Sequence, residues 1–118
     1  MTTGSSSLDD IDVALVFEAL VDPIRRQVVQ LLGDGPRLAG ELAKASGVSP
    51  SAMSRQLRIL LEAGLVSAER RADDARLRAF RLRPEPMTAL RVWLDELQVK
   101  WTRQLESFKA HVETEHRP

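Results

Sequence analysis

Apolar side chains recur three and four positions apart along most of the chain, which places them on one side of successive α-helices. Residues that favour a helix start stand at Ser7 with Asp10 three positions later, at Asp22-Pro23 and at Ser49-Pro50. Gly47 and Gly64 follow two of the stretches, where glycine can adopt the left-handed turn that ends a helix. The pattern predicts five helices, over residues 8–21, 23–32, 38–46, 50–63 and 87–113.

The spacing changes between residues 65 and 82, where apolar and polar residues alternate on both sides of a polar turn. Phe80 and Leu82 would lie on one side of the second alternating stretch. Two such stretches joined by a turn predict a β-hairpin, which we expect Pro84 and Pro86 to end. The expected fold class is therefore mainly α with one β-hairpin.

The order of these elements is that of a winged helix-turn-helix. Two short helices separated by a turn that contains glycine, with a hairpin after the second, are typical of it. A length of 118 residues suits one domain with an extension. We expect the winged helix-turn-helix domain at 8–83, a long C-terminal dimerisation helix at 84–114, a disordered tail at 1–7 and a frayed tail at 115–118.

The helix at 50–63 has two unlike sides. The apolar side carries Met53, Leu57, Leu60 and Leu61, and the opposite side carries Ser51, Ser54, Arg55 and Arg58. Hydroxyls and guanidiniums on a rigid helix suit the DNA major groove, where they reach base edges and phosphates. We therefore interpret this segment as a DNA-recognition helix and include its capping residue, Ser49, among the candidate contacts. The alternative is an ordinary solvated surface helix.

The distribution of charge favours DNA over that alternative. The whole chain has a net charge of zero, but residues 49–83 hold eight arginines against four acids. Residues 1–22 hold five acids and no base. Arginines gather at the tip of the hairpin, and we expect Arg71, Arg76 and Arg78 to lie along the phosphate backbone or reach toward the minor groove. The alternative for the hairpin is an edge kept soluble by charge.

The C-terminal helix carries an apolar stripe too long for one small domain to cover. At about 1.5 Å per residue it would be about 40 Å long. A second copy is the simplest cover, and the expected dimer contacts are Leu15, Leu90, Trp93, Leu94, Leu97, Trp101, Leu105 and Phe108. The alternative is a helix folded back over its own domain. A two-fold dimer would present two recognition helices to major grooves about 34 Å apart, which predicts an inverted-repeat operator.

Trp93 and Trp101 are eight residues apart and share a side of that helix. They suit either ordinary packing between the copies or a pocket there for an unidentified apolar small-molecule effector. Packing is the preferred interpretation, and both remain open.

Three runs resemble the ArsR/SmtB family of winged-helix transcriptional repressors. They are ALVDPIRRQVVQLL, ELAKASGVSPSAMSRQLRILLEAGLV and AFRL, and the resemblance covers about residues 17–82. It implies a homodimer that occupies an operator near its own promoter and leaves when a signal arrives. It also implies that Ser51, Ser54, Arg55 and Gln56 lie at the DNA face, which adds Gln56 to the candidates.

Two departures from the family concern metals. Members that sense metals use cysteines on the third helix, which here reads LAGELAKAS, so the chain resembles a subgroup that lacks them. The other known site lies on the dimerising helix, where Asp95 has no histidine nearby. His111, Glu115 and His116 remain, in a segment expected to fray. We expect no metal site and no cofactor.

Composition excludes several other classes. The chain has no cysteine, its first ten residues lack the charge and apolar core of a signal peptide, and no apolar run approaches membrane-spanning length, so we expect a bacterial cytoplasmic protein without membrane partners. It has no catalytic constellation, so we expect no enzyme and no catalytic residue. The alternative function is a winged-helix protein–protein interaction module whose arginines meet an acidic protein. Ser51 and Ser54 favour DNA, because electrostatic docking gains little from hydroxyls.

Overall fold

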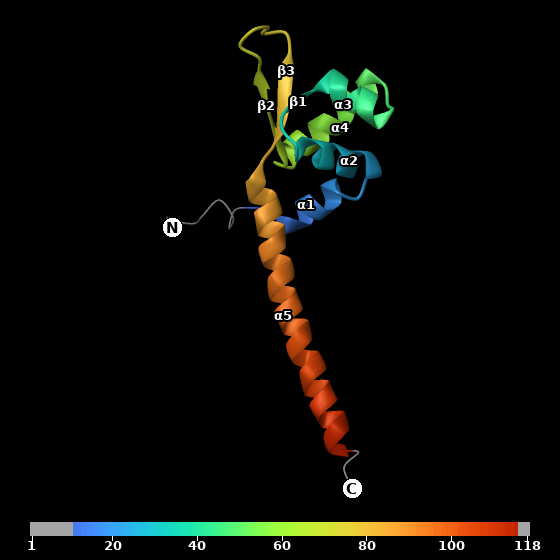
Figure 1. Ribbon diagram of the computed structural model, residues 1–118, viewed down its shortest axis with the longest axis vertical. Coiled ribbons are helices and arrows are strands. Elements are labelled where there is room, and N and C mark those ends of the chain that lie inside the picture. The colour runs from blue at the N-terminus through green and yellow to red at the C-terminus, as the bar shows by residue number, and fades with distance from the viewer. Residues whose placement is uncertain (1–10, 116–118) are drawn as a thin grey trace.

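A computed structural model describes residues 11–115 of the chain (Figure 1). The helices are α1 (Val13–Ala19), α2 (Pro23–Leu32), α3 (Ala39–Ser46), α4 (Pro50–Glu62) and α5 (Pro84–Glu115), and the strands are β1 (Arg37–Leu38), β2 (Val66–Arg70) and β3 (Arg78–Leu82). The strands form one antiparallel sheet in the order β1-β3-β2. The expected fold class, a mainly helical winged helix-turn-helix with a long C-terminal helix, is confirmed.

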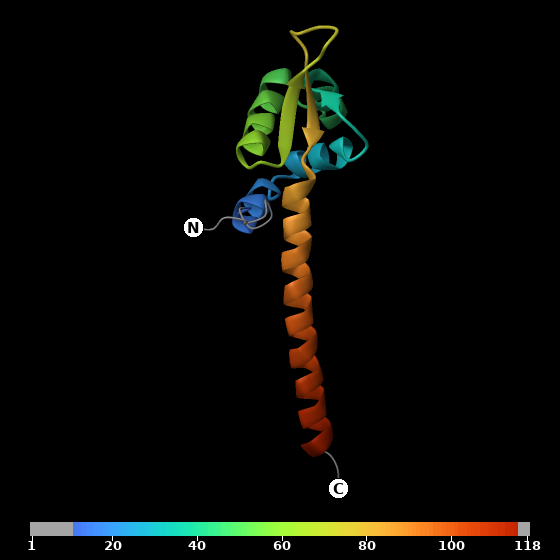
Figure 2. The same ribbon diagram turned by 90° about the vertical axis from the view of Figure 1, so that its left-hand side faces the viewer.

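The hairpin of β2 and β3 forms the wing, with Val66 opposite Leu82 and Arg70 opposite Arg78. Phe80 of β3 anchors the wing because its side chain is buried in the core, while the tip projects beyond the helices (Figure 2).

Strand β1 was not expected, because two residues are too short to show an alternating pattern. It pairs with β3, and Leu38, expected in the third helix, instead precedes it and donates its backbone N–H to the Glu41 carboxylate at 2.8 Å.

The core lies where α1 to α4 meet the sheet. Its largest fully buried side chains are Leu42, Met53, Leu60, Leu65, Val16 and Val28. Met53, Leu57 and Leu60 of α4 are buried and Leu61 packs against the same cluster, so the predicted apolar side of this helix is confirmed. Burial of these side chains sets the rotation of α4 about its axis.

Helix ends follow the expected capping residues. The Asp22 carboxylate accepts the backbone N–H of Ile24 at 2.7 Å, and the Ser49 hydroxyl accepts that of Ala52 at 3.1 Å. Gly47 and Gly64 have φ values of 68° and 77°, the left-handed conformation that favours glycine. The start and end of α4 are therefore set by its own sequence.

The limits expected for the first helix were wrong. Within the described residues it begins at Val13, because the Asp12 carboxylate caps it by accepting the Ala14 N–H at 2.9 Å. It ends at Ala19 instead of residue 21. The capping box proposed at residues 7–10 lies outside the described part of the chain.

The long helix α5 begins at Pro84, where the C-terminal dimerisation helix was expected to begin and three residues before the start given by the apolar pattern. Pro84 and Pro86 do end the strand, but both lie in the first turn of α5, where a proline leaves no helical hydrogen bond unmade. The helix runs to Glu115, one residue beyond the expected dimerisation helix and two beyond the apolar pattern. Its first turns pack on α1, and the rest extends away from the domain, so the molecule measures 76 × 42 × 21 Å (Figures 1 and 2).

Candidate nucleic-acid interface

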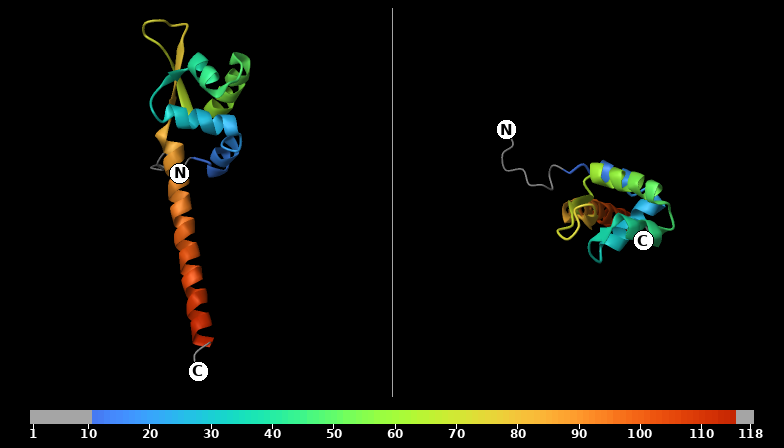
Figure 3. Two further views of the ribbon diagram at one scale, coloured as in Figure 1. Left: turned by 45° about the vertical axis from the view of Figure 1, so that its right-hand side comes forward. Right: turned by 90° about the horizontal axis from the view of Figure 1, so that it is seen from above.

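The candidate contacts on α4 lie on one exposed face. Ser51, Ser54, Arg55 and Arg58 are all exposed, on the side of α4 opposite its buried leucines. Ser49 stands at the same end, where its hydroxyl caps the helix and lies 3.3 Å from the Ser51 hydroxyl. Figure 3 shows that this helix and the wing lie at the end of the molecule opposite the C-terminal end of α5. One partner surface could therefore contact α4 and the wing at the same time.

Gln56 differs from its neighbours because it is half-buried. Its side-chain oxygen accepts a hydrogen bond at 2.8 Å from Nη1 of Arg25, a residue of α2. The same guanidinium donates to the backbone oxygens of Ala19 at 2.6 Å and Glu18 at 3.4 Å. Arg25 thus joins the end of α1 to the middle of α4, a link that helical periodicity gave no reason to expect. The predicted contact of Gln56 with DNA remains a prediction.

The acids of the wing offset two of its arginines. Arg71 pairs with Asp73 at 2.6 Å, and Arg76 pairs with Asp74 at 3.2 Å. The hydrogen bond from Arg71 lowers the pKa of Asp73, and that from Arg76 lowers the pKa of Asp74, because each guanidinium favours the charged form of its carboxylate. The comparison of arginine and acid numbers in the sequence did not reveal these ion pairs. The signal that could have revealed them is the spacing of two positions between each arginine and its acid.

Arg78 stands apart from those pairs. Its guanidinium lies over the Phe80 ring, 5.3 Å from the ring centre. Within residues 11–115 no carboxylate lies at ion-pair distance from it or from Arg55 and Arg58. These three arginines are therefore the candidate contacts with the most available charge.

The stripe proposed for dimerisation is largely uncovered. Leu15 is 47% exposed, Trp101 56%, Leu105 69% and Phe108 67%. Trp93 and Leu94 are also exposed, whereas Leu90 and Leu97 are half-buried. Trp93 packs within the same chain, edge to face on Phe17 with ring centres 5.4 Å apart. The helix does not fold back over its own domain.

The described residues were also compared with the requirements of a metal site and of a membrane-spanning helix. His111 lies 3.0 Å from Glu115, but no three potential ligands within residues 11–115 are grouped to hold a metal ion. His116 lies outside that range. Among residues 11–115, none of the helices combines the length and the apolar composition of a membrane-spanning segment.

Comparison with known proteins identifies the family. The family model described as bacterial regulatory protein, arsR family, matches residues 22–68, from the cap of α2 into β2. The chain is 37% identical to the HTH-type transcriptional regulator Rv2034 of Mycobacterium tuberculosis over 99 residues, which is 84% of this chain and 87% of that protein. The chain belongs to the ArsR family of transcriptional regulators.

Two further comparisons place this ArsR-family chain among its relatives. It is 38% identical over 58 residues to the transcriptional repressor SdpR of Bacillus subtilis, covering 49% of this chain and 64% of that one. It also resembles the solution structure of a homodimeric winged helix-turn-helix DNA-binding domain, Mb0332 of Mycobacterium bovis. That likeness has a TM-score of 0.57 at 29% identity, over 90% of this chain and 95% of the other.

Proposed function

We propose that this ArsR-family regulator is a homodimeric repressor that binds an inverted-repeat operator through α4 and the wing in the bacterial cytoplasm. The observation that carries the proposal is the division of α4 into a buried apolar side and an exposed side of serines and arginines. Core packing and caps at both ends hold that exposed side in place, as reading of base edges requires. The relative SdpR is named a repressor, which supports the direction of regulation.

The second half of the proposal is the dimer. Exposed aromatic and aliphatic side chains continue along α5 from Trp93 to Phe108, on a helix that leaves its own domain. A monomer would keep this patch in water at a cost of roughly 25 cal/mol per Å² of apolar surface. The likeness to a homodimeric domain supports a second copy as the cover. Two-fold symmetry then requires a symmetric operator.

A salt titration with random-sequence duplex DNA tests the proposal against the protein-interaction alternative. We expect binding at low salt that weakens steeply as salt rises, because each phosphate contact releases counterions. Absence of binding at low salt would favour the interaction module, whose arginines would meet an acidic protein.

Arg55→Ala should reduce discrimination between operator and random DNA. Arg55 is exposed in the first turns of α4 and has no carboxylate partner in the described chain, so it is free to bind a base edge. A lost bidentate base contact costs about 1 to 3 kcal/mol on the operator alone. Fluorescence anisotropy on both duplexes measures this, with Arg103→Ala on α5 as the charge-matched control. Equal weakening on both duplexes would reduce Arg55 to a phosphate contact.

Arg78→Ala should weaken binding to both duplexes alike. Its guanidinium has no carboxylate partner within residues 11–115, so its full charge is available to phosphate. The slope of log K against log salt should fall by about one. Arg76→Ala should change the slope less, because Arg76 is already paired with Asp74. An unchanged slope for Arg78→Ala would remove the wing from the contact surface.

A further inference from the structure

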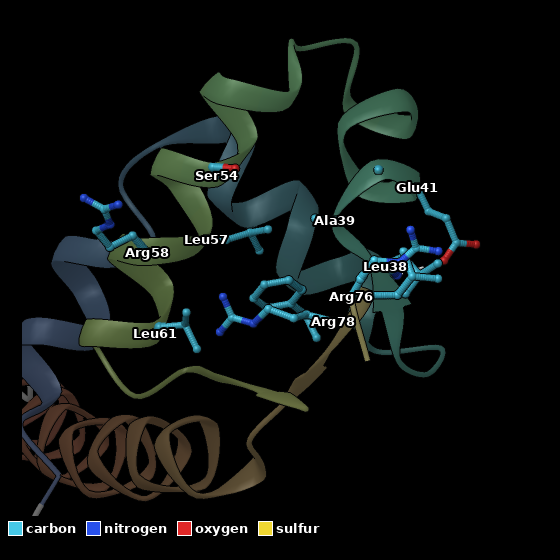
Figure 4. Close-up of a pocket in the computed structure, with 12 residues that line it drawn as sticks. Leu38, Ala39, Glu41, Ser54, Leu57, Arg58, Leu61, Arg76 and Arg78 are labelled. Carbon is cyan, nitrogen blue, oxygen red and sulfur yellow. Dashed lines mark hydrogen bonds between the residues drawn. The ribbon is translucent and has the colours of Figure 1, made fainter. Parts of the chain in front are cut away.

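A cleft of about 540 Å³ opens between α4, the start of α3 and strand β3 (Figure 4). Pockets that bind small molecules in proteins measure roughly 300 to 1,000 Å³. The cleft lies within the proposed DNA-binding surface, because Ser54 and Arg78 both line it. A ligand in the cleft would therefore lie beside residues that are proposed to contact DNA.

The floor of this cleft is apolar. Leu57 and Leu61 point into it from α4 (Figure 4). Phe80 of β3 also lines it. Leu38 and Ala39 form the opposite wall. Leu57 and Phe80 are themselves buried, so the apolar surface that an alkyl chain or aromatic ring would cover on leaving water belongs to the half-buried Leu38, Ala39 and Leu61 and the exposed Leu77.

The guanidinium of Arg78 lies over that apolar floor. The Arg78 side chain crosses the cleft toward α4 with its guanidinium over Phe80 (Figure 4). The other charged residues of the lining are occupied or turned away. Glu41 and Arg58 point away from the cleft, and Arg76 pairs with Asp74. An apolar floor beneath one available guanidinium fits an anion with an apolar body.

We propose that this cleft binds a small carboxylate with an apolar chain, and that its occupancy releases DNA. The release rests on the proposed function, because the ligand's carboxylate and a DNA phosphate would compete for the same guanidinium of Arg78. The chain would also fill the space between α4 and the wing. Ligand and operator are then mutually exclusive without any change in the dimer.

Calorimetry with the full chain and two matched probes, octanoate and 1-octanol, tests the site without DNA. We expect octanoate to bind about tenfold or more tightly than the alcohol, since a charge-assisted hydrogen bond to Arg78 is available only to the acid. In Arg78→Gln the two affinities should converge. Equal binding of acid and alcohol to the unmodified chain would overturn the proposal.

Ala39→Leu separates this cleft from the apolar stripe of α5. Ala39 lines the cleft and lies outside the proposed DNA contacts, so a larger side chain there should reduce octanoate affinity about tenfold or more. The variant should still bind DNA, in a complex that octanoate no longer dissociates. Unchanged octanoate affinity, or a DNA complex of the unmodified chain that saturating octanoate leaves intact, would overturn the proposal.

Amide chemical shifts of the unmodified chain give a reading that does not depend on a variant. Octanoate should perturb Leu57, Leu61 and Phe80 most. Perturbations centred on residues 93–108 would place the ligand on α5 and overturn the proposal. If the chain binds no DNA at all, the proposed function fails, and calorimetry and chemical shifts still decide whether the cleft holds a carboxylate.

Discussion

Replacing Trp101 by glutamate should convert the dimer into monomers and remove operator binding. Trp101 is 56% exposed in the single chain and lies in the middle of the α5 stripe. In a dimer joined by that stripe, each copy would bury a carboxylate without a partner. Such burial costs about 3 kcal/mol or more, which raises the dimer dissociation constant over a hundredfold. Sedimentation velocity measures the change directly.

Val99→Glu is the matched control for that experiment. Val99 is also a large apolar side chain, 51% exposed, and stands two residues before Trp101 on the same helix. Two residues correspond to about 200° around a helix, so Val99 faces away from the stripe. The same new charge should leave the dimer intact there. Dimers of Trp101→Glu, or monomers of both variants, would contradict the proposed interface.

Arg25→Ala should reduce the free energy of unfolding by about 2 to 3 kcal/mol, because it removes charge-assisted hydrogen bonds to two elements at once. The lost partners are the Ala19 and Glu18 carbonyls at the end of α1 and the Gln56 side chain on α4. Urea unfolding gives the total loss. Amide hydrogen exchange should show faster opening in α4 as well as α1.

Arg26→Ala distinguishes the loss of hydrogen bonds at the end of α1 from the loss of the hydrogen bond to α4. Arg26 donates to the carbonyls of Leu20 and Val21 at 2.9 Å each, so it also holds the end of α1, but none of its hydrogen bonds within residues 11–115 reaches α4. We expect a smaller loss, about 1 kcal/mol, with exchange in α4 unchanged. Equal losses, or unchanged exchange in α4 for Arg25→Ala, would show that the bond to Gln56 does not stabilise the recognition helix.

The elements that could be predicted from the sequence are those that local chemistry determines. Ser49, Pro50 and Gly64 set the limits of α4, and the spacing of its leucines sets which side is buried. Capping residues and prolines do not decide where a helix begins when the sequence offers two possible starting points. Asp12 caps α1 inside a stretch whose apolar pattern begins earlier, and the prolines at 84 and 86 can end a strand or open a helix.

The features that sequence did not reveal depend on contacts between distant residues. Strand β1 exists because Arg37 and Leu38 pair with β3, more than forty positions away. The bond between Arg25 and Gln56 joins residues 31 apart. The cleft beneath Arg78 likewise needs α3, α4 and β3 to meet, and no single run of residues describes it. Periodicity describes one element at a time, so these juxtapositions lie beyond it.

Selection of bound duplexes from a random pool by the full chain tests the central claim most directly. The proposed dimer predicts recovery of an inverted repeat whose half-sites are centred about one helical turn, roughly 10 base pairs, apart. The same selection with Arg55→Ala should recover a less defined half-site at unchanged spacing. Recovery of no common sequence, or of a single half-site without its inverted mate, would contradict the account.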